Sequence, residues 1–194
     1  MKILFIHGFG SSGAYKMASS LRIILKPCEV IAPDVPIEPE KAFPMLLDMC
    51  GREDPDLVVG LSLGGFWAQK LRGRRKILVN PDLHVSNFLR AHMGVNEYLS
   101  PRADGALTFE VTPQICDAYE AIERTEFDGL DEAEISLTTG MFADSDELIH
   151  CGPEFERRYP GRGIIYPGKH LPIFPELKNY LAPVAREILS NPKG

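Results

Sequence analysis

Residues Gly60–Gly64 read Gly-Leu-Ser-Leu-Gly, a G-x-S-x-G pattern centred on Ser62. An apolar run over 57–59 precedes the pattern, and a helix-like run over 65–71 follows it. This order predicts a serine on a sharp turn from a strand into a helix. A side chain at position 60 or 64 would crowd the serine backbone or the neighbouring strand. We therefore interpret Ser62 as a nucleophile at a helix N-terminus, where developing negative charge is favoured.

A serine hydroxyl is a poor nucleophile unless a histidine takes its proton and a carboxylate orients that histidine. The chain contains five histidines. His7 ends the first apolar run, His84 and His92 lie in an irregular central segment, and His150 lies at a helix start. His170 alone occupies the loop after the last predicted strand, so we predict that it is the base.

The acid is expected just after the strand predicted over 135–142, where two aspartates stand close together. Asp146 is favoured because an apolar pair, Leu148-Ile149, follows it and can anchor the next helix. Asp144 remains an alternative, although it could instead cap that helix or bind a loop amide. Glu147 is a third and weaker candidate.

Acyl transfer also needs two backbone amides aimed at one developing oxyanion. The amide of Leu63, directly after the serine, is expected to supply the first. The glycine-rich loop His7–Ser12 follows the first predicted strand, and the Phe9 amide is our candidate for the second, with Gly10 as the fallback. The loop matches neither G-x-x-x-x-G-K-[ST] nor G-x-G-x-x-G, which argues against a phosphate-binding role.

Short apolar runs alternate with helix-like segments along most of the chain. This alternation predicts an α/β fold, with a mostly parallel six-stranded sheet and helices on both faces. The predicted strands are 2–6, 29–32, 57–60, 76–79, 135–142 and 163–166, and the predicted helices are 13–25, 39–50, 65–72, part of 146–158, and 176–189.

Residues 84–134 interrupt this alternation with helical pieces and no convincing strand. They carry eleven acidic residues and three arginines, a net charge of -8 (3 - 11). We expect a small helical cap insertion over the carboxyl edge of the sheet, where α/β folds bind ligands. A pair of surface helices without a role in specificity is the alternative.

Composition narrows the class of protein. A length of 194 residues with 44% apolar residues suits a single domain over 1–194, and a net charge of -6 argues against nucleic-acid binding. The first apolar run is too short for a signal peptide, and no run approaches membrane-spanning length. The four cysteines lack any C-x-x-C spacing, so we expect reduced thiols in a cytoplasmic protein.

The sequence resembles the short bacterial α/β-hydrolases of the YqiA/YcfP-like esterase family. The matching residues are His7-Gly8-Phe9, Ser11-Ser12, Lys16, Pro33-Asp34, Pro36, Pro39, Val59–Gly65, Val79-Asn80-Pro81, Gly94–Glu97, Asp146-Glu147-Leu148 and Gly168-Lys169-His170. The resemblance implies a serine esterase for small acyl esters, without metal or organic cofactor. It places Ser62, Asp146 and His170 at the triad positions. Ala143 stands where the family has glycine, which keeps Asp144 open as the acid, and Asn80-Pro81 receives no role.

The leading functional hypothesis is a carboxylic ester hydrolase that works through an acyl-enzyme and takes a small-molecule acyl ester. A thioesterase or amidase could use the same residues, and a catalytically silent binding protein could share the fold. An apolar acyl pocket could draw on Phe9, Phe66, Trp67, Met141 and Leu171. Phe66 and Trp67 could equally be core residues.

Overall fold

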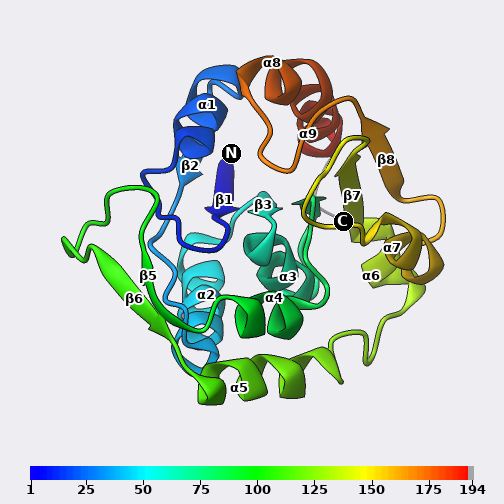
Figure 1. Cartoon of the computed structure of the whole chain (residues 1–194). Helices are drawn as coiled ribbons and strands as arrows, with labels where there is room; N and C mark the ends of the chain where they lie inside the picture. Colours follow the sequence, from blue (N-terminus) through cyan, green and yellow to red (C-terminus); the bar gives the residue numbers. More distant parts are fainter. Residues whose placement is uncertain (192–194) are drawn as a thin grey trace.

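Six parallel strands form one sheet at the centre of the protein (Figure 1). The computed structural model describes residues 1–191. The strands lie in the order β2-β1-β3-β4-β7-β8, and each neighbouring pair is parallel. Their bounds are β1 Lys2–Ile6, β2 Glu29–Ile31, β3 Leu57–Leu61, β4 Lys76–Val79, β7 Thr138–Ala143 and β8 Gly163–Tyr166. The predicted six-stranded α/β sheet is confirmed.

Helices cover both faces of the sheet because its central strands are apolar on both sides. In β1, Ile3 and Phe5 join one buried cluster and Leu4 and Ile6 join the other, as alternation along a strand requires. The first cluster is completed by α1 (Lys16–Ile24), η1 (Leu177–Leu181) and α9 (Ala182–Ser190). The second is completed by α2 (Pro39–Glu53), α3 (Leu63–Lys70), α4 (Val85–Ala91), α5 (Pro113–Glu123) and α7 (Gly152–Arg158).

Element ends differ from the predicted ranges where a helix meets a strand or another helix. The strand predicted over 135–142 begins at Thr138, because helix α6 occupies Glu132–Leu137. The Asp131 carboxylate accepts the Glu134 amide (2.8 Å) and so caps the start of that helix. The helix predicted over 13–25 begins at Lys16. The one predicted over 176–189 is divided into α8 (Phe174–Glu176), η1 and α9.

Residues 84–137, which form most of the segment between β4 and β7, are called the insertion below. The expectation that it holds helices and no strand is wrong, because β5 (Gly94–Glu97) and β6 (Thr108–Val111) form an antiparallel pair. Both strands are only four residues long and expose one face, and the connection over 98–107 is no tight hairpin turn. The sequence therefore lacks the usual hairpin signal.

The insertion reaches the carboxyl edge of the sheet beside β1. The ring of Phe9, in the loop after β1, contacts Phe88 of α4 and Phe109 of β6 with centroids 5.2 and 5.1 Å apart. Among residues 1–191, no helix has both the length and the apolar character of a membrane span.

Candidate active site

The parallel arrangement gathers five loops at one edge of the sheet. The loops after β1, β3, β4, β7 and β8 carry, in that order, His7, Ser62, Asn80, Asp146 and His170. Because strand order across the sheet is β1-β3-β4-β7-β8, these residues are also neighbours from one loop to the next. The topology thus collects residues that are up to 163 positions apart (170 - 7) in the sequence.

Ser62 lies on a strained turn between β3 and α3. Its φ of 54° and ψ of -117° are unusual for a residue with a side chain. A Cβ at Gly60 would collide with the carbonyl oxygen of Gly64, and a Cβ at Gly64 would collide with that of Ile6. The two glycines therefore allow the turn to close against itself and against β1, as the sequence predicts.

The side chains of Ser62, His170 and Asp146 form a continuous chain of hydrogen bonds. The serine Oγ lies 3.0 Å from His170 Nε2, and His170 Nδ1 lies 2.8 Å from Asp146 Oδ2. Donation from Nδ1–H to the carboxylate leaves Nε2 free to accept the serine proton. Only 4% of His170 and 8% of Asp146 are exposed, so water competes little with these bonds.

The two aspartates in the loop after β7 make different contacts. The second carboxylate oxygen of Asp146, Oδ1, accepts the amides of Leu148 (2.8 Å) and Ile149 (2.9 Å). Asp144 is exposed and accepts the amide of Gly168 (3.2 Å) instead of contacting the imidazole. The structure therefore brings Asp146 to His170 and uses Asp144 to join two loops. Glu147 is exposed, and no hydrogen bond joins it to His170.

The loop after β1 lies against the serine. A Cβ built on Gly8 would lie 3.4 Å from the Cβ of Ser62, which is van der Waals contact distance, so Gly8 is a direct neighbour of the serine side chain. Among the described residues, neither the Phe9 amide nor the Leu63 amide has a hydrogen-bond acceptor. A ligand would therefore not have to displace a protein acceptor from either amide.

His7 holds this loop, a role that sequence reasoning missed when it weighed the residue only as a base. Its Nδ1–H donates to the Gly8 carbonyl (2.8 Å), and its Nε2 accepts the Val35 amide (2.9 Å). These two bonds require a neutral imidazole, since protonated Nε2 has no lone pair for Val35. Burial accordingly lowers the pKa of His7 from 6.5 to about 4. The signal in the sequence was its position directly before Gly8-Phe9.

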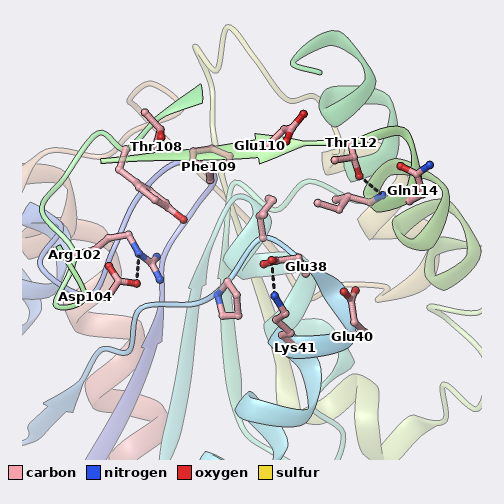
Figure 2. Close-up of a pocket in the computed structure, with 14 residues that line it drawn as sticks. Glu38, Glu40, Lys41, Arg102, Asp104, Thr108, Phe109, Glu110, Thr112 and Gln114 are labelled. Carbon is pink, nitrogen blue, oxygen red and sulfur yellow. Dashed lines mark hydrogen bonds and ion pairs between the residues drawn. The ribbon is translucent and has the colours of Figure 1, made fainter. Parts of the chain in front are cut away.

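A groove of about 810 Å³ opens beside the site, between the start of α2 and the β5–β6 pair (Figure 2). Figure 2 shows the Phe109 ring on the groove side of its strand, with Thr108 and Glu110 pointing away. The groove shares Pro36, Ile37, Tyr98 and Phe109 with a cavity of only about 10 Å³ that Phe9 and Leu63 also line.

The aromatic residues expected near an acyl pocket have different positions. Phe66 and Trp67 are fully buried core residues, and Trp67 packs against Phe43 and Tyr119. Met141 is buried under the opposite face of the sheet. The interpretation of Phe66 and Trp67 as core therefore holds, and Phe9 is the half-buried aromatic next to the serine.

The fold and the serine turn together define the class of protein. A parallel sheet covered on both faces, with this turn after a central strand, is the α/β-hydrolase fold. The chain belongs to the uncharacterised protein family UPF0227, whose profile matches residues 2–114, in agreement with the YqiA/YcfP-like resemblance. That match includes Ser62 and ends before Asp146 and His170.

Solved structures with the same fold include three hydrolases that differ widely from this chain in sequence. FphF, a fluorophosphonate-binding serine hydrolase of Staphylococcus aureus, is 14% identical over 98% of this chain and 84% of its own, with a TM-score of 0.63. The esterase domain of a Rhodothermus marinus protein is 16% identical (96% and 86%, TM-score 0.63). A pyrethroid hydrolase of Sphingobium faniae JZ-2 is 14% identical (99% and 98%, TM-score 0.63). No protein of curated function matches the sequence significantly.

Proposed function

We propose that this protein is a serine hydrolase that cleaves small carboxylic acyl esters through an acyl-enzyme. The observation that carries the proposal is the hydrogen-bonded series from Ser62 through His170 to Asp146, with links of 3.0 and 2.8 Å. A hydroxyl, an imidazole and a carboxylate in this order form the arrangement that activates a serine. The Phe9 and Leu63 amides, which have no protein acceptor among the described residues, are our candidates for the oxyanion site.

The proposed reaction has two stages, acylation of Ser62 and hydrolysis of the acyl-enzyme. Ser62 Oγ attacks the acyl carbon while His170 Nε2 takes the hydroxyl proton, and the carbonyl electrons move to an oxyanion held by the two amides. The oxyanion collapses, the bond to the alcohol oxygen breaks, and His170 returns its proton to the departing alcohol. Water then attacks the acyl-enzyme by the same route, releasing the acid and free serine. Asp146 keeps the imidazole tautomer and stabilises its charged form.

The groove supports a preference for uncharged substrates. Apart from Glu110, which points away, its lining carries three carboxylates and two cationic side chains, a net charge of -1 (2 - 3). Lys41 pairs with Glu38 at 2.7 Å, so that cation is not available to a substrate anion. The cavity of about 10 Å³ beside Phe9 has room for about one water molecule, so we place the acyl group of the substrate in the open groove.

Only part of the negative charge of the groove belongs to the insertion. Glu38 and Glu40 belong to the start of α2 and not to the insertion. Within the insertion, burial together with the nearby Glu123 and Glu154 raises the pKa of Glu126 to about 8. Glu126 is therefore largely protonated at neutral pH, and the formal charge of -8 overstates the field that the insertion creates.

A fluorophosphonate probe and a panel of substrates test the proposal. The wild-type protein should react with the probe and hydrolyse p-nitrophenyl esters of short acids, in preference to acyl-CoA thioesters or anilides. Ser62→Ala should abolish labelling and lower kcat by about 10⁴-fold or more, because the covalent route is lost. A folded Ser62→Ala protein that retained a tenth of wild-type turnover would contradict the mechanism.

A further inference from the structure

Asn80 connects the two loops that carry Asp146 and His170. It directly follows β4, the strand between the strand of the serine and the strand of the acid. Its φ of 44° lies in the left-handed region, where asparagine is one of the few side-chain-bearing residues found regularly. The residue is 1% exposed. A buried amide in this conformation must find partners for all of its polar atoms.

The side chain of Asn80 makes those bonds in two directions. Its Oδ1 accepts the Ala143 amide (2.8 Å), three residues before Asp146. Its Nδ2 donates to the carbonyl oxygen of His170 (2.8 Å), with the Tyr166 hydroxyl at 2.9 Å and the Lys169 carbonyl at 3.2 Å. The main-chain amide of Asn80 also donates to the Met141 carbonyl (2.8 Å).

Only one orientation of the amide satisfies these partners. Exchanging Oδ1 and Nδ2 would place an oxygen against the carbonyls of His170 and Lys169 and an NH₂ group against the Ala143 N–H. The loop after β7, which carries Asp146, is called the acid loop, and the loop after β8, which carries His170, is called the base loop. The acid loop requires the acceptor Oδ1 and the base loop requires the donor Nδ2. Aspartate has no N–H donor, so it would lose the hydrogen bonds to the base loop. Because one planar group serves both loops, it sets the spacing between them.

The turn that carries Asn80 is itself packed against the nucleophile. A Cβ at Gly65 would lie 2.8 Å from the Cβ of Pro81, so this proline sits directly on α3. The Asp82 amide donates to the Ser62 carbonyl (3.3 Å), and the Ser62 amide donates to the Val79 carbonyl (3.0 Å). The turn over 79–82 thus contacts all three loops that carry the proposed triad.

We propose that Asn80 is a positioning residue that holds the acid loop and the base loop in register with the serine turn. The inference rests on the proposed function, and it assigns Asn80 no contact with the substrate. Its effect on rate comes from keeping His170 Nδ1 on Asp146 while Nε2 stays on Ser62. Displacements of about 1 Å in such an arrangement cost on the order of 10²-fold in rate.

Asn80→Gly tests this role, because it removes the amide and tolerates the positive φ. Gln69→Ala is the matched control, because Gln69 is a fully buried amide that bonds the Glu126 carbonyl and the Tyr159 hydroxyl, away from the triad. We expect kcat per fluorophosphonate-titrated site to fall about 10- to 10²-fold in Asn80→Gly, with KM within about threefold. Gln69→Ala should lose stability and keep its kcat per site.

A double-mutant cycle separates positioning from general destabilisation. In an Asp146→Asn background, adding Asn80→Gly should cost less than about threefold in kcat, because the interaction it supports is already lost. Full additivity, or a wild-type kcat per titrated site in Asn80→Gly, would overturn the proposal. If Asn80→Gly does not fold, Tyr166→Phe replaces it as the test, because this change removes one hydrogen-bond partner of Asn80. Tyr166→Phe should lower kcat about two- to fivefold at unchanged KM.

A measurement that does not need turnover keeps this inference distinct from the proposed function. The His170 Nδ1–H proton, shielded between the ring and Asp146, should give a strongly deshielded NMR signal in the wild-type protein. We expect the signal to be lost in Asn80→Gly and retained in Gln69→Ala. Retention in both variants would reject the role of Asn80, whereas an inactive wild-type protein that shows the signal would reject only the proposed esterase activity.

Discussion

The two sides of Ser62 are built in different ways. On one side, His170, Asp146 and Asn80 are buried, and their polar atoms bond to partners on the loops after β7 and β8. On the other side, the groove is open and carries ion pairs on its rim, with the Lys41 side chain 63% exposed. Exposed ion pairs contribute little to stability, whereas buried bonded groups are costly to disturb.

This difference suggests that the two sides have different roles in catalysis and in substrate binding. The buried side holds atoms at separations of 2.8–3.0 Å and should govern kcat. The open side should govern which substrates bind, and its residues should accept substitution at small cost. His7 is an exception on the groove side, because it is a buried residue that shapes the loop of Phe9.

Apart from loss of Ser62 itself, the largest effect should come from the acid on the buried side. Asp146→Asn should lower kcat by about 10³- to 10⁴-fold, because the amide favours the wrong imidazole tautomer. Asp144→Asn is the matched control on the same loop and should change kcat less than about threefold, since its carboxylate contacts the Gly168 amide and not His170. Steady-state kinetics with a short p-nitrophenyl ester measure both. The reverse ranking would assign the acid role to Asp144.

A second effect should appear in the pH dependence of stability through His7. Its pKa falls from 6.5 to about 4 on folding, so the unfolded chain binds more protons between these values. Stability from this group is therefore complete above about pH 6.5 and is lost as the pH falls toward 4, by about 3 kcal/mol in all.

Chemical denaturation of the wild type and of His7→Gln at several pH values measures this contribution. The glutamine variant has no imidazole to protonate, so its free energy of unfolding should fall less between pH 6.5 and 4. Comparison of the two proteins removes the titration of groups that they share. Parallel pH profiles would show that His7 is not held neutral in the folded protein.

The smallest effect should come from the groove. Glu40→Gln removes an exposed carboxylate from its lining and should raise kcat/KM for an anionic ester about two- to threefold at low salt. The neutral ester should be unaffected, and the gain should vanish near 1 M salt, where the Debye length is about 3 Å. Glu132→Gln, an exposed change on α6 outside the groove, is the control. An equal gain in both variants would mean that the groove does not receive the substrate.

Sequence alone was sufficient to predict the sheet and the turn that carries Ser62. The runs over 2–6, 57–60 and 76–79 are apolar and short, so they predict buried parallel strands, and Gly60 and Gly64 predict the turn at Ser62. These signals are local, since periodicity and turn residues act over a few positions. The β5–β6 pair was not predicted, because its strands are short and half exposed and no turn residues join them at the spacing usual in a hairpin.

Tertiary structure decided the finer contacts of the candidate site. Asp144 and Asp146 differ by two positions, and only the folded loop shows that one meets His170 while the other meets Gly168. The bonds of Asn80 span 63 residues to Ala143 and 90 to His170. A hydrogen bond over such a separation leaves no periodic trace in the sequence, because it exists only after β4, β7 and β8 are paired side by side.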